Sequence, residues 1–117
     1  MRISSLLIVM LLAVSAAPLA ADARSDAKKQ VEFGIAVAQR GLWREAIYRW
    51  ERAAKIDPSY AAAHNNLAIA YEHEGELVKA RAAYEKALEI EPNNSFIKQN
   101  YELFKEINDR TTRQDTQ

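Results

Sequence analysis

The chain has 117 residues, no cysteine, and equal numbers of basic and acidic residues, 16 of each. The absence of cysteine excludes disulfides, thiolate nucleophiles and thiolate metal sites. The balanced charge leaves no basic field of the kind that attracts nucleic acid, so no nucleic-acid partner is expected. Apart from a leader at the start, the chain is long enough for one domain with a modest core.

Residues 1–23 are predicted to be a secretory signal peptide. A positive charge at Arg2 precedes an unbroken apolar run over residues 6–14 and a stretch rich in small residues. This run is shorter than the ~20 residues that a membrane-spanning helix needs. Ala21-Asp22-Ala23 fits the small-x-small rule for cleavage. We therefore expect export to the periplasm or cell envelope. The alternative is an uncleaved signal retained as an N-terminal anchor, the only case in which a membrane contact is expected.

Four helices are predicted next, at residues 26–40, 43–56, 60–74 and 77–90, with Ser25 as the N-cap of the first. Each carries apolar residues at helical spacing, and glycine and proline are nearly confined to the junctions. The residues expected in the core of these helices are Phe33, Gly34, Val37, Trp43, Ala46, Ile47, Trp50, Ala53, Leu67, Ala70, Tyr71, Leu77, Ala80, Tyr84, Ala87 and Leu88.

A fifth helix is predicted at residues 95–108, after three residues that can each cap it. It carries Ile97, Tyr101 and Phe104 on one face. Its place at the end of the helices indicates a capping helix that closes the last open hydrophobic face. Residues 109–117 contain no apolar side chain and are predicted to be a disordered tail.

Two segments of this helical region repeat each other. Pro58 and Pro92 lie 34 positions apart, and glycine, alanine and an aromatic residue precede each of them at the same offsets. A period of about 34 residues in a helical pattern is typical of stacked helix–turn–helix repeats. Each glycine permits a tight turn, each alanine permits a close helix crossing, and each proline ends a helix.

This pattern resembles the tetratricopeptide repeat (TPR) family. The motif positions are Gly34, Ala46, Trp50, Ala53 and Pro58 in the first copy, and Ala68, Ala80, Tyr84, Ala87 and Pro92 in the second. The resemblance implies an all-α solenoid with a TPR domain over residues 24–108, built from repeats at 27–60 and 61–94 and the capping helix at 95–108. Gln30 and His64 depart from the tryptophan that the family often carries there, and Val37 departs from its usual tyrosine.

The resemblance also implies a concave groove lined by the first helix of each pair. The family's ligand positions give the expected partner-binding residues Val31, Ile35, Gln39, Asn65, Ile69, Glu72, His73, Phe96, Gln99 and Leu103. Ile35, Ile69 and Leu103 are each 34 positions apart, so they are expected to form one apolar column. The lysine and arginine of the family's carboxylate clamp are missing, so recognition of a C-terminal carboxylate by that mode is not expected.

Little in the sequence indicates catalysis. His64 and His73 are nine positions apart, which places them about 100° apart around a helix, and neither has a carboxylate at a metal-ligand spacing. The three glycines are isolated, so no phosphate-binding loop is formed. We therefore predict no enzyme activity, no metal and no cofactor, with an acid–base role for His73 as the weaker alternative.

The leading hypothesis is a non-enzymatic scaffold that binds a partner peptide or amphipathic helix in the groove. A second hypothesis is a structural subunit that forms a homodimer through the apolar column and has no separate ligand. A third interpretation is that the column simply widens the core stripe.

Overall fold

The computed structural model describes residues 17–116, so residues 1–16 of the predicted signal peptide lie outside the described part. The described residues form five helices and no strand, which confirms the all-α prediction. The helices are α1 (Ala17–Gln39), α2 (Trp43–Ile56), α3 (Ala61–His73), α4 (Leu77–Ile90) and α5 (Ser95–Asp115).

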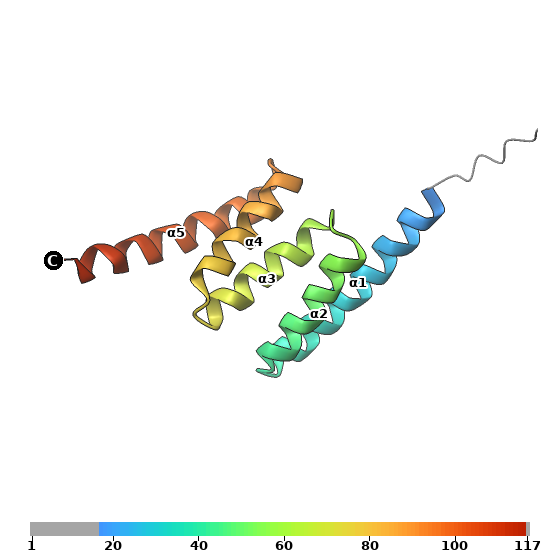
Figure 1. Ribbon diagram of the computed structural model, residues 1–117, viewed down its shortest axis with the longest axis horizontal. Helices are drawn as coiled ribbons and strands as arrows, with labels where there is room; N and C mark the ends of the chain where they lie inside the picture. Colours follow the sequence, from blue (N-terminus) through green and yellow to red (C-terminus); the bar gives the residue numbers. More distant parts are fainter. Residues whose placement is uncertain (1–16, 117) are drawn as a thin grey trace, which may run out of the picture.

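The helices stack in chain order. Each packs against the next, and α1 also contacts α3 across the first turn between repeats. Figure 1 shows α1 beside α2 and α3 beside α4, with α5 continuing the stack past α4. The arrangement is therefore two helix pairs followed by a single helix, and α1, α3 and α5 are its first-helix positions.

The turn inside each pair is built on a glycine. Gly41 has φ +80° and Gly75 has φ +76°, a left-handed backbone that a Cβ would strain. At the first turn, Leu42 N donates to Val37 O at 3.0 Å and Gly41 N donates to Ala38 O at 2.9 Å. Glu76 N repeats the first of these bonds, to Tyr71 O at 2.8 Å. These bonds satisfy the last carbonyls of each first helix and reverse the chain within two residues.

The core follows the small-residue positions of the repeat. Ala46, Ala53, Ala80 and Ala87 are all 0% exposed, as predicted. Because these side chains are small, the helices approach closely, and larger side chains fill the space beside them. Trp50, Tyr84 and Phe104 are almost completely buried there.

Two residues expected in the core lie at the surface instead. Phe33 is 48% exposed and Leu77 is 42% exposed. In α1 the buried stripe is formed by Ala27, Val31, Gly34 and Val37, and Phe33 lies one residue before Gly34, about 100° around the helix. The central carbon of the Arg49 guanidinium lies 4.2 Å from the centre of the Phe33 ring. Leu77 is the first residue of α4 and faces a hollow between α4 and α5.

Two helices are longer than predicted. Helix α1 begins at Ala17, so Ser25 is an interior residue and the prediction of an N-cap there is wrong. Helix α5 runs to Asp115, so the predicted end at Asn108 and the disordered tail are wrong as well. Polar contacts hold this extension, since Arg81 pairs with Asp109 at 3.7 Å and Arg110 pairs with Glu106 one turn earlier.

Candidate functional site

A hollow of about 320 Å³ opens between α1, α3 and the start of α2. Apart from Gln39 and Asn66, its walls are apolar or aromatic. Ile35 is 41% exposed there, and Ile69 is partly buried against the core. The lining residues are Ile35, Ala38, Gln39, Trp43, Trp50, Asn66 and Ile69. We call this the apolar hollow.

A second hollow, of about 350 Å³, lies between α1, α3 and the first turn of α5. Its walls are more polar, and two of its residues, Ile35 and Asn66, also line the apolar hollow. The two therefore form one continuous groove. The residues that line the second, or mixed, hollow are Val31, Glu32, Ile35, Tyr60, Ala62, Asn65, Asn66, Glu91, Asn94, Phe96 and Ile97.

The charged residues of this groove are both acidic. Glu32 and Glu91 line the mixed hollow and are exposed, and neither forms an ion pair within the described part of the chain. Burial raises the pKa of the Tyr60 phenol, and the negative charges of Glu32 and Glu91 raise it further, while Arg24 opposes them. Both carboxylates therefore lie near the same phenol, where the Arg24 guanidinium opposes their effect.

Asn65 is the most buried polar side chain of the groove, at 3% exposure. Its Oδ1 accepts a hydrogen bond from Asn100 Nδ2 at 3.3 Å, which joins α3 to α5. Its own amide nitrogen has no partner in residues 17–116 and belongs to a side chain that lines the mixed hollow. The groove thus offers an unused donor beside its two carboxylates.

Six of the ten predicted site residues line these hollows: Val31, Ile35, Gln39, Asn65, Ile69 and Phe96. Of these, Val31 is only 5% exposed and belongs to the core, so it contributes mostly shape. The expected apolar column is incomplete, because Leu103 lies outside both hollows although it is 56% exposed.

The other predicted residues have different neighbours. Glu72 accepts a hydrogen bond from Tyr84 Oη at 3.0 Å, so it is engaged with α4. His73 stacks on Trp43, with ring centroids 4.2 Å apart. Gln99 lines neither hollow. The repeat pattern gives the position of each residue in its helix. It does not give the contacts that Glu72 makes with Tyr84 of α4 and that His73 makes with Trp43 of α2.

Sequence reasoning missed several groove residues. Trp43 and Trp50 come from α2, and Tyr60, Glu91 and Asn94 come from the turns between repeats. The family's ligand positions lie on first helices only, so they do not point to these residues. One usable signal was the spacing of Asp57 and Glu91, which occupy the same repeat position 34 residues apart just before each proline.

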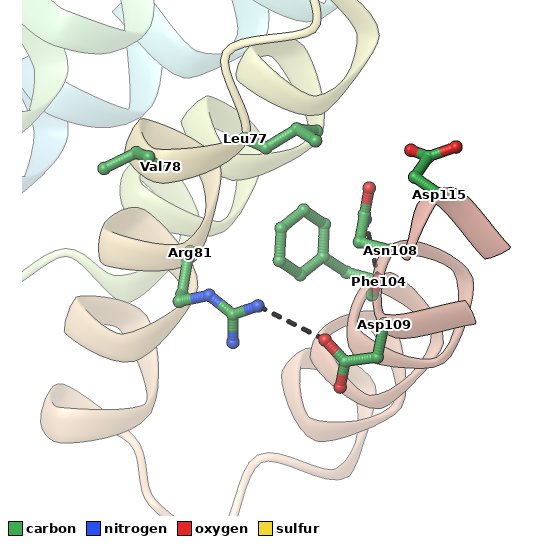
Figure 2. Close-up of a pocket in the computed structure, with 7 residues that line it drawn as sticks. All are labelled: Leu77, Val78, Arg81, Phe104, Asn108, Asp109 and Asp115. Carbon is green, nitrogen blue, oxygen red and sulfur yellow. Dashed lines mark hydrogen bonds and ion pairs between the residues drawn. The ribbon is translucent and has the colours of Figure 1, made fainter. Parts of the chain in front are cut away.

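A third hollow lies on the other side of α5 and measures about 380 Å³. Figure 2 shows Leu77 and Phe104 facing it from α4 and α5, with the Arg81–Asp109 ion pair across one side. Val78 points away from Phe104 in this view and is 86% exposed. This hollow lies between the start of α4 and the C-terminal half of α5.

Both histidines have a neighbour in the structure. His64 Nε2 lies 3.0 Å from the carbonyl oxygen of Pro58, and the ring of His73 is stacked on Trp43. Within residues 17–116 there is no group of three or more histidine or carboxylate side chains that could hold a metal ion. None of the helices described is both long and apolar enough to cross a bilayer.

Two family models match the chain, "TPR repeat" over residues 34–75 and "Tetratricopeptide repeat" over residues 61–94. Together they span more than half of the sequence. The second match covers the same residues as the predicted second repeat, and the first begins at Gly34, inside the predicted first repeat.

Several known proteins are similar to this chain. A chloroplastic tetratricopeptide repeat domain-containing protein of Arabidopsis thaliana is 37% identical over 62 residues, 53% of this chain and 21% of the relative. The type IV pilus assembly protein PilF of Pseudomonas aeruginosa is 34% identical over 86 residues, 72% of this chain and 34% of the relative. A probable N-acetylglucosaminyltransferase, SPINDLY of Solanum lycopersicum, is 38% identical over 60 residues, 6% of its length. The chain therefore matches about a third or less of each.

Proposed function

The chain belongs to the tetratricopeptide repeat family, whose repeats are protein-interaction modules, and from this premise we propose that it is an exported, non-enzymatic scaffold that holds a partner peptide or helix in the groove between α1, α3 and α5. The observation that carries the proposal is the apolar hollow. Ile35, Trp43 and Ile69 leave a concave, mostly apolar surface there, of the kind that accepts an anchoring side chain.

The continuity of the groove supports a peptide rather than a small molecule. The apolar and mixed hollows share Ile35 and Asn66, and together they run from the start of α2 to the first turn of α5. An extended segment or a helix can place one side chain in the first hollow and polar groups in the second. A partner that contacts all three first helices also stabilises their stacking by mass action.

The proposed location rests on the sequence of the leader and on two relatives. Residues 1–23 have the layout of a secretory signal. One relative is a pilus assembly protein and another is chloroplastic, which favours a role at a cell envelope or membrane system. The transferase relative shares only 6% of its length with the match, so its name supports no enzyme activity here.

The experiment uses the absence of cysteine. A single Gln39→Cys variant carries one thiol at the rim of the apolar hollow, and a thiol-linked photocrosslinker attached there is expected to capture a partner in envelope extract. Adding Ile35→Glu places a charge in the hollow, so the same crosslink is expected to disappear. Ile35 is 41% exposed, which makes it a safer position for this test than the partly buried Ile69.

Val78→Glu is the matched control, since Val78 is 86% exposed on α4 and lines neither part of the groove. The crosslink is expected to survive this change. Circular dichroism of both variants establishes that the fold is kept. A crosslinked product that persists with Ile35→Glu, in a folded protein, overturns the groove as the binding site.

Self-association is the second candidate function. Helix α5 exposes Phe96, Leu103 and Ile107, at 63%, 56% and 50%, and these residues are spaced seven and four positions apart as along one helical face. Such a face can pair with its copy in a second chain. Sedimentation equilibrium of the mature domain at micromolar concentration distinguishes the two: a pure monomer rules out the homodimer.

A further inference from the structure

The charge around the groove specifies its occupant more closely. We infer, on the basis of the proposed function, that the partner segment carries a lysine or arginine side chain next to its apolar anchor, and that Glu32 and Glu91 receive this cation. The apolar anchor occupies the hollow at Ile35 and Ile69, and the cation occupies the mixed hollow beside it.

Neither carboxylate of the mixed hollow, Glu32 or Glu91, has a cationic partner in the described part of the chain. By contrast, Glu45 pairs with Arg49 at 3.0 Å and Glu102 pairs with Lys105 at 2.8 Å. No lysine or arginine lines either hollow. An incoming cation therefore meets two like charges on facing elements, α1 and the turn before α5, and displaces no resident ion pair.

Arg24, whose guanidinium lies beside the Tyr60 ring of the mixed hollow, is already engaged. Arg24 pairs with Asp57 and donates to Ser59 O at 3.3 Å, and its guanidinium lies 4.8 Å from the centre of the Tyr60 ring. These contacts hold it at the Asp57 turn. It forms no ion pair with Glu32 or Glu91, so a cation of the partner can bind these carboxylates without displacing it.

A second, independent feature points to a ligand at the same place. Asn65 is only 3% exposed and lines the mixed hollow. Its amide nitrogen has no hydrogen-bond acceptor among residues 17–116. This nitrogen is not among the fully buried unpartnered atoms, so it is open to the hollow and can donate to a ligand oxygen in place of water. The backbone carbonyl of a bound peptide supplies one, and its neighbouring side chain then reaches the two carboxylates.

The test begins with a random dodecapeptide phage library selected on the mature protein and counter-selected on Ile35→Glu. Phage that bind only the wild-type groove are expected to carry Lys or Arg within a few residues of Leu, Ile, Met or Phe. The selected peptide is then synthesised with a fluorophore, together with a copy in which the basic residue is glutamate. Fluorescence anisotropy measures both affinities.

The double variant Glu32→Gln/Glu91→Gln is expected to weaken binding of the basic peptide by roughly three- to tenfold, the scale of two exposed charge pairs. The affinity advantage of the basic peptide is also expected to shrink between about 0.05 M and 0.5 M NaCl because salt screens it. Glu89→Gln/Glu102→Gln is the control, with the same change in net charge outside both hollows.

The outcomes are separable. Groove-dependent peptides with no basic enrichment, or equal affinity of the basic and glutamate peptides, overturn this inference and leave the groove intact. Absence of any peptide that depends on Ile35 counts against the proposed function itself. If Ile35→Glu instead abolishes self-association seen by sedimentation, the occupant is a second copy of the chain and the basic-peptide inference is wrong.

Discussion

The indole nitrogen of Trp50 donates a hydrogen bond to the carbonyl oxygen of Val31 at 3.0 Å, across the interface of α1 and α2. Gly34 makes this approach possible. A Cβ at position 34 would lie 2.3 Å from the Trp50 Nε1 atom, well inside van der Waals contact. In the second repeat the same two positions hold Ala68 and Tyr84, both buried. The repeat with the larger ring, Trp50, therefore has glycine at the paired position, and the repeat with the smaller ring, Tyr84, has alanine.

This match predicts the cost of adding a single methyl group. We expect Gly34→Ala to lower the free energy of unfolding by about 2 kcal/mol, because overpacking costs about 1–3 kcal/mol and outweighs the helix propensity gained by replacing glycine. Urea denaturation followed by circular dichroism measures it. Combining Gly34→Ala with Trp50→Tyr copies the pair of the second repeat. The methyl group should then cost much less, and an unchanged cost would contradict the steric explanation.

Arg24 and Asp57 predict an acid-sensitive contact between α1 and the first inter-repeat turn. The hydrogen bond from Arg24 lowers the pKa of Asp57, and bonds from Ser59 lower it further against the opposing effect of burial. A carboxylate whose pKa is lower in the folded state stabilises the fold above its unfolded pKa and loses that contribution as pH falls through the folded value.

We therefore expect Asp57→Asn to reduce stability at neutral pH by up to about 1 kcal/mol, with the difference from wild type closing below about pH 4. Asparagine keeps an acceptor for the Ser59 amide, so the change isolates the charge. Thermal melts across this pH range test it. Asp26→Asn, at an exposed carboxylate with a 3.9 Å pair to Lys29, should have little effect at either pH.

Three tyrosines link successive helices through glutamates. Tyr71 donates to Glu51, Tyr84 to Glu72 and Tyr101 to Glu85, at 2.8, 3.0 and 2.8 Å. Burial, followed by the adjacent carboxylate, raises the pKa of each phenol above its usual value near 10. The phenols are therefore protonated at neutral pH, and all three hydrogen bonds are formed there.

A raised phenol pKa means that stability is fully present below about pH 10 and is lost as pH rises through the folded values. We expect Tyr84→Phe to lower stability by about 1 kcal/mol at neutral pH, the net value of one hydrogen bond, and to lose less stability than wild type above pH 10. Denaturant titrations at both pH values measure it. The exposed residue Tyr48 provides the control. If the stability of Tyr84→Phe and of Tyr48→Phe fell equally steeply above pH 10, the prediction would be contradicted.

Gln30 offers a stabilising change. Its Oε1 is buried without a hydrogen-bond partner in the part of the chain that the structure describes. Because an unsatisfied buried acceptor costs about 1–3 kcal/mol, Gln30→Leu is expected to raise stability by about 1 kcal/mol. That corresponds to a rise in melting temperature of about 4–8 °C for a domain of this size. Gln99→Leu, at an exposed position of α5, should leave the melting temperature unchanged. A fall in melting temperature for Gln30→Leu would show that the Gln30 Oε1 atom is solvated.

The sequence alone determined the parts of this protein that depend on local spacing. Glycines at 41 and 75 place the tight turns, the alanines at 46, 53, 80 and 87 place the close helix crossings, and Pro58 and Pro92 follow the helix ends. These are single-residue requirements of backbone conformation and size, so they can be read without knowing which helices meet.

Only the tertiary structure decided which side chains of the first helices remain available to a ligand. Val31 and Glu72 occupy ligand positions of the repeat, yet Val31 is buried under Trp50 and Glu72 is bonded to Tyr84. Glu32 and Glu91 are 59 positions apart and meet at one hollow because α1 and the turn before α5 are brought together by stacking. Arg81 of α4 likewise pairs with Asp109, in the part of α5 that extends beyond its predicted end. Burial and charge pairing arise between elements, so no periodicity within one element reveals them.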